Sequence, residues 1–283
     1  MRQVSYLIPK TMVPNSDIKF LQWALPRMGY RWEGFRKPRN QVLKRIRERM
    51  QQLGLSGGYP EFKEYLESHP EEWKQLDRLC DVTISKFFRD RKVWEFLRDH
   101  VLYEMLKKHE AKSVNLWSVG CCNGEEPYTL AMISEQLTAN SDQQKNISIL
   151  ATDRNAEVLE RARTGRYPSG ALKELTEDEI TTFFHETGGK DDEDFEINEF
   201  LKQQISFELR DIQYSLPDQV FDIILCRNLV FTYFTQERQL QFLQLLKPRL
   251  ANEAFLVIGS NEELPKLGWL EAVSKTHRVY GRY

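Results

Sequence analysis

Two adjacent glutamates beside a glycine turn are the first residues in this sequence that suggest chemistry. In VGCCNGEEPYTLAM, Gly120 and Gly124 bracket a turn, and Glu125 and Glu126 then open a helix. Glycines at such a turn let the backbone approach a ligand closely. Two carboxylates at a helix start disfavour a pyrophosphate, and the P-loop Lys-Ser/Thr pair is missing. We therefore expect a nucleoside ligand that carries a cationic group; the alternative is a capped helix with a solvated glutamate pair.

A second acidic residue follows the next apolar run. In ILATDRNAEVLERAR, Asp153 stands where a strand would meet its loop. A carboxylate there can accept hydrogen bonds from both ribose hydroxyls of a nucleoside. Asp153 or Asn155 could instead only cap the following helix, and we assign the cap to Asn155 and the ribose to Asp153. The glycine turn and this acid together favour an S-adenosylmethionine site over a dinucleotide site.

An α/β fold must position these residues. After Lys112, short apolar runs alternate with helical patterns, which predicts a mostly parallel sheet covered on both faces. The stretch from Phe183 to Phe207 breaks the alternation and suggests an inserted hairpin or small subdomain. The expected strands are SVNLWSV, NISILAT, ISFELR, FDIILC and AFLVIG, and the expected helices are EEPYTLAMISEQL, AEVLERAR and QERQLQFLQLLKPRL.

The segment before Lys112 shows helical patterns and no convincing strand. Between Arg27 and Arg49 there are nine basic and two acidic residues. Apolar residues recur at helical spacing behind Asn40, so we expect an amphipathic helix from Asn40 to Leu53, capped by Asn40, with a basic exposed face. Such a face suits an acidic helical partner, although a basic helix is more often only a solvated surface.

Composition excludes several classes of protein. The chain has 283 residues, 41% of them hydrophobic, and a net charge of −2, so it carries no overall attraction to nucleic acid. No apolar run is long enough for a membrane span, and the first residues do not resemble a signal peptide, so we expect no membrane insertion and a cytoplasmic location. The spacing of Cys80, Cys121, Cys122 and Cys226 indicates neither a disulfide framework nor a metal site.

Four segments together resemble a known family. TISKFFRD, SVGCCNGEEPYTLAM, ATDRNAEVLERARTGRYP and FDIILCRNLVFTYF follow the order and spacing of the CheR family, chemotaxis-type methyltransferases that esterify receptor glutamates with S-adenosyl-L-methionine and release S-adenosyl-L-homocysteine. The resemblance implies a Rossmann-like class I methyltransferase domain over 83–283, a small all-helical domain over 1–82, and an inserted β subdomain at about 183–207. It also implies a protein-glutamate O-methyltransferase that works as a monomer and docks a receptor on the basic helix 40–53.

The resemblance also assigns roles to individual residues. The family has Asn-Leu where this chain has Asp211 and Ile212, and an ionised aspartate can still accept the adenine amino protons. The implied cofactor contacts are Thr83, Ser85 and Arg89 on one wall, Glu125 at the methionine moiety, Asp153 at the ribose, Asp211 and Ile212 near the adenine, and Arg227 and Asn228 completing the site.

The two residues expected to act on the acceptor are Arg89 and Tyr233. An ionised glutamate needs no general base, and Arg89 could hold a carboxylate, either that of the acceptor or that of the cofactor. The alternative for Arg89 is a surface pair with Asp90. LVFTYF has one residue more than the family pattern, so either a bulge keeps Tyr233 at the family's tyrosine position or Thr232 takes it; we favour the bulge.

Three functions remain in view. The first is methylation of receptor glutamates, and the second is the same chemistry on a different protein or a small molecule. The third is a non-enzymatic module that senses the cofactor or binds RNA through the basic segment. The first 16 residues receive no role.

Overall fold

The computed structural model describes residues 14–108, 113–138, 147–188 and 195–282. They form two compact units. The first comprises the described residues up to Val82 together with Tyr233–Thr235, and the second comprises those of Thr83–Thr232 and Gln236–Tyr283. Among the described residues, no helix combines the length and the apolar character that crossing a bilayer requires. Residues 1–13 lie outside the described residues, and they make up most of the first 16 residues, to which the sequence assigned no role.

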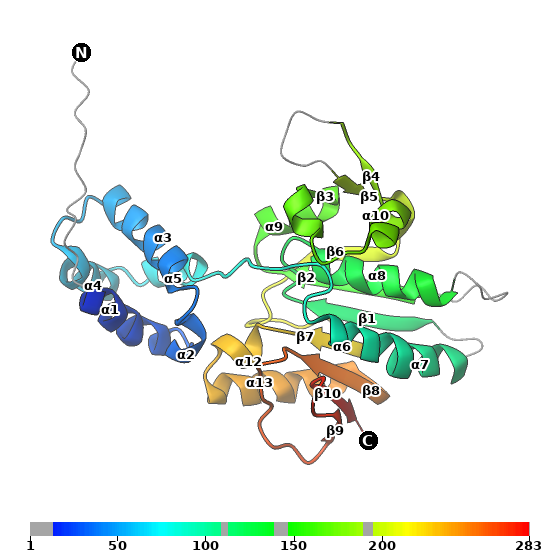
Figure 1. The fold of residues 1–283 in the computed structure, drawn as a ribbon. Coiled ribbons are helices and arrows are strands. Elements are labelled where there is room, and N and C mark those ends of the chain that lie inside the picture. Colours follow the sequence, from blue (N-terminus) through cyan, green and yellow to red (C-terminus); the bar gives the residue numbers. More distant parts are fainter. Residues whose placement is uncertain (1–13, 109–112, 139–146, 189–194, 283) are drawn as a thin grey trace. The chain divides into compact units, whose positions relative to one another are not determined.

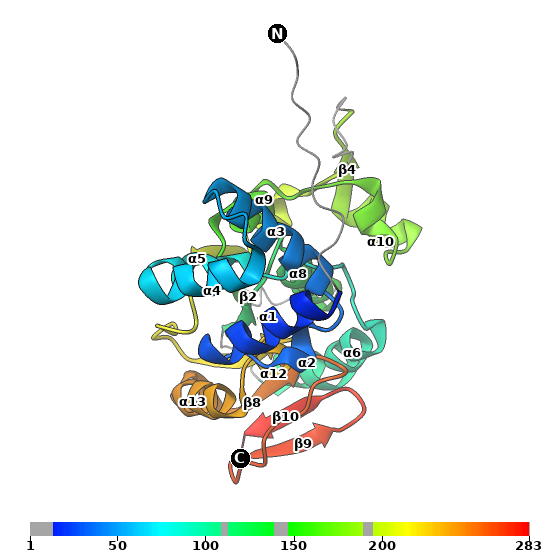
Figure 2. The ribbon, with the colours of Figure 1, turned by 90° about the vertical axis from the view of Figure 1, so that its left-hand side faces the viewer.

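The first unit is helical (Figures 1 and 2). Its core is built from apolar side chains on the inner faces of these helices, with Phe20 and Phe62 stacked at 5.6 Å between ring centroids. The helices are α1 (Pro14–Arg27), α2 (Trp32–Phe35), α3 (Arg39–Gln52), α4 (Gly58–Ser68) and α5 (Glu72–Leu79).

The expected basic helix is α3, but its start differs from the prediction. Asn40 lies inside the helix, and Pro38 occupies the N-cap position without a side-chain cap bond. Proline suits a helix start because it has no backbone N–H to satisfy. The prediction that Asn40 caps the helix was wrong: the local pattern favoured an asparagine cap, but the chain already turns into the helix at Pro38.

A mixed, mostly parallel sheet of seven strands forms the frame of the second unit, as predicted. Its strand order is β6-β2-β1-β7-β8-β10-β9, and only β10 and β9 run antiparallel to their neighbours. The strands are β1 (Val114–Val119), β2 (Ile147–Asp153), β6 (Ile205–Leu209), β7 (Phe221–Cys226), β8 (Leu250–Ile258), β9 (Leu270–Ser274) and β10 (Val279–Arg282). The sequence patterns identified the five parallel strands and missed the C-terminal hairpin, drawn in red in Figure 2.

Helices cover both faces of this sheet. Strand order reverses between β1 and β7, so right-handed crossovers place α8 and α9 on one face and α13 on the other (Figure 1). The helices of this unit are α6 (Arg91–Phe96), the π-helical turn η1 (Leu97–Leu102), α7 (Tyr103–Lys108), α8 (Glu125–Thr138), α9 (Ala156–Thr164), α12 (Val230–Tyr233), α13 (Gln236–Leu246) and the 3₁₀ turn η3 (Lys247–Arg249). Pro127 lies in the first turn of α8, where its missing N–H costs no hydrogen bond.

A small antiparallel sheet is inserted between α9 and β6. It has the order β3-β5-β4, and its ends lie together because the Ile197 N–H donates to the Gly165 carbonyl oxygen at 2.9 Å. The insertion therefore begins at about residue 166, earlier than the 183 expected, and Ile205–Leu209 belongs to the large sheet. Its elements are β3 (Arg166–Tyr167), η2 (Ser169–Leu172), α10 (Glu177–Phe183), β4 (Phe184–Glu186), β5 (Phe195–Ile197) and α11 (Glu199–Lys202); residues 189–194 lie outside the description.

Candidate functional site

The glycine turn after β1 lies beside the point where strand order reverses, the usual ligand site of open α/β sheets. Gly120 and Gly124 have φ angles of +69° and +92°, in the left-handed region that favours glycine. A Cβ on Gly120 would lie 2.5 Å from Leu229 Cδ2, so the turn has no room for a side chain. The sequence-based expectation of a tight turn at this strand end is confirmed.

Glu125, the first residue of α8, places a buried carboxylate at this turn. The residue is only 5% exposed, and its Oε2 has no hydrogen-bond partner among the described residues. Burial raises the pKa of this carboxyl group, and the nearby Ser85 and Asn123 side chains oppose the rise. An unsatisfied buried acceptor of this kind suits a cationic group such as the ammonium of a bound methionine moiety. Ser85 and Glu125, both predicted site residues, are thus neighbours.

Asp153 ends β2 and has one hydrogen bond on each carboxylate oxygen. Oδ2 accepts the Cys122 N–H at 3.0 Å, and Oδ1 accepts the Asn155 N–H at 2.9 Å. Burial raises the Asp153 pKa, and these two bonds oppose the rise. Each oxygen keeps a second lone pair, so the carboxylate can also accept two vicinal ribose hydroxyls. The Asn155 side chain accepts from the Glu157 and Val158 N–H groups and caps α9, as predicted.

These two carboxylates fit S-adenosylmethionine. Glu125 offers a cation a buried carboxylate oxygen without a hydrogen-bond partner, and Asp153, at the end of β2, offers acceptors to the two ribose hydroxyls. Asp211 follows the neighbouring strand β6; its Oδ1 accepts the Gln213 N–H at 2.9 Å, and its Oδ2 lies 3.8 Å from an Arg154 guanidinium nitrogen. Ile212 beside it is half-buried. The β2–β6 pairing brings the ends of both strands to one edge of the sheet.

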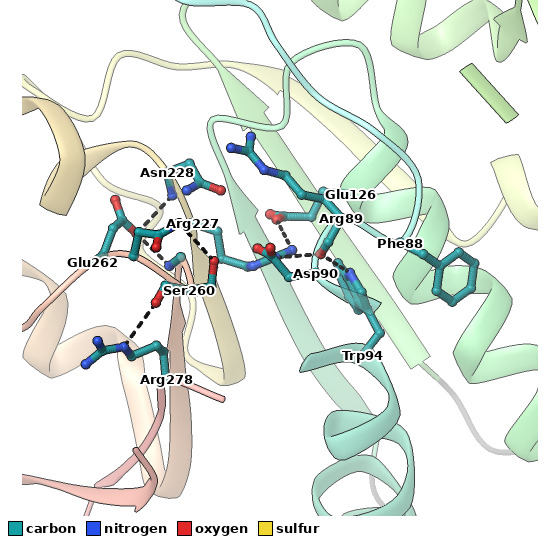
Figure 3. Close-up of polar contacts among 12 residues, drawn as sticks. Phe88, Arg89, Asp90, Trp94, Glu126, Arg227, Asn228, Ser260, Glu262 and Arg278 are labelled. Carbon is teal, nitrogen blue, oxygen red and sulfur yellow. Dashed lines mark hydrogen bonds and ion pairs between the residues drawn. The ribbon is translucent and has the colours of Figure 1, made fainter. Parts of the chain in front are cut away.

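The Arg227 guanidinium, just after β7, ties three segments together (Figure 3). Nη2 donates to the Arg89 carbonyl oxygen at 2.7 Å and to Asp90 Oδ2 at 2.9 Å, and Nη1 donates to Glu126 Oε2 at 3.3 Å. The group also lies over the Trp94 ring, 5.0 Å from its centroid. With a side chain only 2% exposed, Arg227 serves to hold the FFRD segment and the start of α8 against the end of β7.

Arg89 presents a cation at the same place. Asp90 pairs with Arg227, so the alternative interpretation of Arg89 as half of a pair with Asp90 was wrong. The Arg89 Nη1 donates to the Ile84 carbonyl oxygen at 3.3 Å, and no carboxylate of the described chain forms an ion pair with it. Figure 3 shows its guanidinium pointing away from Asp90. Thr83, at the start of this segment, is exposed.

The backbone that carries Arg89 has an unusual conformation. Phe88 and Asp90, the residues on either side, have φ angles of +47° and +61°. The Phe88 N–H donates to the buried Thr129 hydroxyl at 3.2 Å, and the Arg89 carbonyl oxygen accepts from Trp94 Nε1 at 2.9 Å. Left-handed residues without glycine are strained and persist where surrounding contacts fix them. The FFRD segment is therefore held in one defined shape beside α8.

Asn228 follows Arg227 and is also left-handed, with φ of +57°. Its backbone N–H donates to Glu262 Oε2 at 2.9 Å. Sequence reasoning missed Glu262, a carboxylate only 2% exposed, because a glutamate pair in a segment such as GSNEELP normally indicates a solvated loop. The available signal was its position in the loop that follows the apolar run AFLVIG, where parallel strands present their functional side chains.

The segment LVFTYF, which has one residue more than the family pattern, contains the single helical turn α12. The Thr232 hydroxyl donates to Glu262 Oε1 at 2.6 Å. The Tyr233 ring contacts Phe35 within the first unit, with ring centroids 4.9 Å apart. The role of Tyr233 at the transferred methyl, and the choice between Tyr233 and Thr232, therefore stay predictions.

Comparisons with known proteins identify the family of this chain. The family model described as CheR methyltransferase, SAM binding domain, matches residues 83–279. The chain is 33% identical over 206 residues to a chemotaxis protein methyltransferase of Listeria monocytogenes, covering 73% of this chain and 75% of that protein. It is 28% identical to that of Borreliella burgdorferi (77% and 80% covered) and 29% identical to that of Escherichia coli (81% and 78% covered). The chain therefore belongs to the CheR methyltransferase family and is an S-adenosylmethionine-dependent methyltransferase.

Proposed function

We propose that this methyltransferase esterifies glutamate side chains of a chemotaxis receptor. Its relatives are named chemotaxis protein methyltransferases, and they align with most of this chain. The observation that carries the proposal is the Arg89 guanidinium, which lies close enough to Glu126 at the start of α8 to act on its charge but forms no ion pair among the described residues. A cation in this position suits a substrate that brings its own carboxylate.

Each site residue then has a role. Glu125, with Ser85 beside it, holds the ammonium of the cofactor, and Asp153 holds its ribose hydroxyls. Asp211 and Ile212 border the adenine. Thr83 completes the wall that Ser85 and Arg89 begin, and Asn228 closes the site at the end of β7, where Arg227 secures it. Tyr233 orients the acceptor.

The chemistry asks little of these side chains beyond placement. The bound cofactor supplies an electrophilic methyl group on a cationic sulfur. A glutamate carboxylate is already ionised at neutral pH, with a reference pKa of about 4.3, so no residue has to remove a proton. Arg89 would hold one or both carboxylate oxygens and fix the angle of approach, and burial around Glu125 limits water at the same place.

Fewer basic side chains of the first unit are available to a receptor than the sequence indicated. Several cations of α3 are used inside the unit: Arg47 pairs with Asp17 at 2.5 Å, Arg49 with Glu72 at 2.8 Å, and Arg45 donates to the Asp81 carbonyl oxygen. Between Arg31 and Arg49, the basic side chains that stay exposed are Arg36, Lys37 and Lys44. We assign the acidic receptor helix to these three.

Methyl transfer to a purified receptor signalling domain tests the chemistry. With the tritiated cofactor, we expect label in the receptor that mild base releases as methanol, because carboxyl esters are base-labile. Arg89→Ala should lower kcat/KM at least about tenfold, given roughly 1.5–3 kcal/mol for a charged hydrogen bond. Unchanged S-adenosylhomocysteine affinity would assign Arg89 to the acceptor, and an equal loss of affinity would assign it to the cofactor. Full activity of Arg89→Ala would remove the proposed role.

Charge reversal tests the docking surface. We expect a triple variant with Glu at positions 36, 37 and 44 to raise KM for the receptor while leaving cofactor affinity unchanged, because opposite charges speed encounter and fix register. The matched control is Lys275→Glu on the exposed β9–β10 turn. Equal KM values for the triple variant and this control would place the receptor elsewhere, and label in small molecules but not in protein would indicate a different acceptor.

A further inference from the structure

Glu262 lies behind the site, where it joins the ends of two parallel strands. Its Oε2 accepts the Asn228 N–H at 2.9 Å and the Gly259 N–H at 2.6 Å, and its Oε1 accepts the Thr232 hydroxyl at 2.6 Å. Asn228 and Thr232 follow β7, whereas Gly259 follows β8. One buried carboxylate therefore connects the loop after β7 to the loop after β8 (Figure 3).

The three donors depend on this carboxylate. Asn228 is in the left-handed conformation, and its N–H donates to the buried Glu262 carboxylate. Two backbone N–H groups share one carboxylate oxygen as their acceptor. Water has little access to take the place of that oxygen, because Glu262 is only 2% exposed. Without the carboxylate, both N–H groups would be buried and unsatisfied, which favours rearrangement of the loop.

Close packing extends the same constraint to the Asn228 side chain. A Cβ added to Gly259 would lie 2.5 Å from Asn228 Nδ2 and 2.8 Å from Glu262 Oε2. The φ angle of Gly259 is outside the left-handed range, so glycine is needed here for space rather than for backbone freedom. The amide of Asn228 is thus located by contact with Gly259 as well as by its own N–H bond.

Arg227 secures the other side of the same loop, through Asp90, the Arg89 carbonyl oxygen and Glu126. The charged or titratable groups that interact with Glu262 are Arg227, which favours its ionised form, and the buried thiol of Cys226. The loop after β7 is therefore fixed from two directions, by a buried cation toward the FFRD segment and by a buried anion toward β8.

We propose that Glu262 is a positioning residue for cofactor binding, because it sets the left-handed Asn228 and the start of α12. This inference rests on the proposed role of Asn228 at the cofactor. Glu262 itself does not have to touch the cofactor. Its effect on the site passes through the Asn228 N–H and the packing of Gly259.

Calorimetric binding of S-adenosylhomocysteine to the full chain tests the proposal. Glu262→Ala should raise Kd at least about tenfold. Each buried donor left without an acceptor costs about 1–3 kcal/mol, and about 1.4 kcal/mol corresponds to a tenfold change in Kd. Glu262→Gln should bind within about threefold of wild type, because its amide oxygen can accept both N–H groups and its amide nitrogen can donate to the Thr232 oxygen. Rescue by glutamine is the signature of positioning through hydrogen bonds.

Three further variants make the outcome decisive. Gly259→Ala keeps the carboxylate but crowds Asn228, and it should also weaken binding, so the proposal stays testable if Glu262→Ala does not fold. Ile133→Ala, two turns along α8 from Glu125, should lower the unfolding midpoint without changing Kd and so controls for stability. Asn228→Ala should weaken binding if that residue serves the cofactor.

The outcomes separate the two ideas. Wild-type affinity in Asn228→Ala would refute the proposed site assignment. Weak binding by Asn228→Ala with wild-type Kd in both Glu262→Ala and Gly259→Ala would overturn the positioning role alone. A Kd for Glu262→Ala that rises no more than that of Ile133→Ala at equal loss of stability would reduce Glu262 to a structural residue.

Discussion

Replacing Arg227 with methionine should destabilise the second unit strongly. Methionine keeps the volume but leaves Glu126 with the Ser118 hydroxyl, which donates to its Oε1 at 2.8 Å, and with the longer-range attraction of the Arg89 cation. Removing one member of a buried ion pair costs about 3–5 kcal/mol. Asp90 is 31% exposed and can regain water, so we take the lower end, about 3 kcal/mol. At 2–4 °C per kcal/mol, the unfolding midpoint should fall by roughly 6–12 °C.

The pH dependence of this loss identifies its cause. Burial raises the Glu126 pKa above its ordinary 4.5, and Arg227 is the main group that opposes the rise. In Arg227→Met the pKa rises further, so the folded state binds a proton more tightly than the unfolded state does. The penalty is therefore full at high pH and shrinks as pH falls through the raised pKa toward 4.5.

Calorimetry or fluorescence-monitored melting between pH 8 and 5 would measure both effects. The control is Lys86→Met, which removes a cation from a surface pair with Glu174 at 3.9 Å and should change the midpoint little. Adding Glu126→Gln to Arg227→Met should recover much of the loss, because the uncompensated charge is then gone. A loss no larger than that of Lys86→Met, or one that Glu126→Gln leaves unchanged, would refute this account.

Three other predictions concern the cofactor carboxylates. Asp153→Asn should weaken S-adenosylhomocysteine binding at least about tenfold by calorimetry, because the amide nitrogen must face either the Cys122 or the Asn155 N–H; unchanged affinity would remove Asp153 from the ribose. Asn155→Ala should cost about 0.5–2 kcal/mol in a urea unfolding curve through loss of the α9 cap, with cofactor affinity preserved. Binding should weaken as pH falls through the raised pKa of Glu125, because only the ionised carboxylate attracts the ammonium; Glu125→Gln should bind weakly at every pH and flatten that dependence, and a profile identical to wild type would contradict the assignment.

The parallel strands could be predicted because burial on both faces leaves continuous apolar runs such as FDIILC, bounded by turn residues. The C-terminal hairpin could not: most residues of β9 are exposed, and the short runs LEAVS and VYGR give no clear alternation. Strand pairing decides their conformation: β10 pairs with the earlier strand β8, and β9 pairs with β10.

The site residues also differ in whether local sequence patterns or distant contacts identify them. Asp153 and Glu125 were identifiable because each stands next to an element boundary that the sequence marks with apolar runs, glycine or proline. Glu262 was not, since its burial depends on donors from residues 228 and 232, which only the folded sheet brings to it. Likewise, no local pattern shows that Asp90 pairs with Arg227 instead of its neighbour Arg89.

The two ends of the inserted sheet lie together, so the insertion and the large sheet can change independently in evolution. Because Ile197 bonds to Gly165, the chain leaves and re-enters the methyltransferase framework at almost the same point. A loop closed in this way tolerates changes in length at low entropic cost, and its far end can be rebuilt without moving β2 or β6. The far end of this insertion can therefore diverge between relatives while the strands that carry Asp153 and Asp211 keep their places.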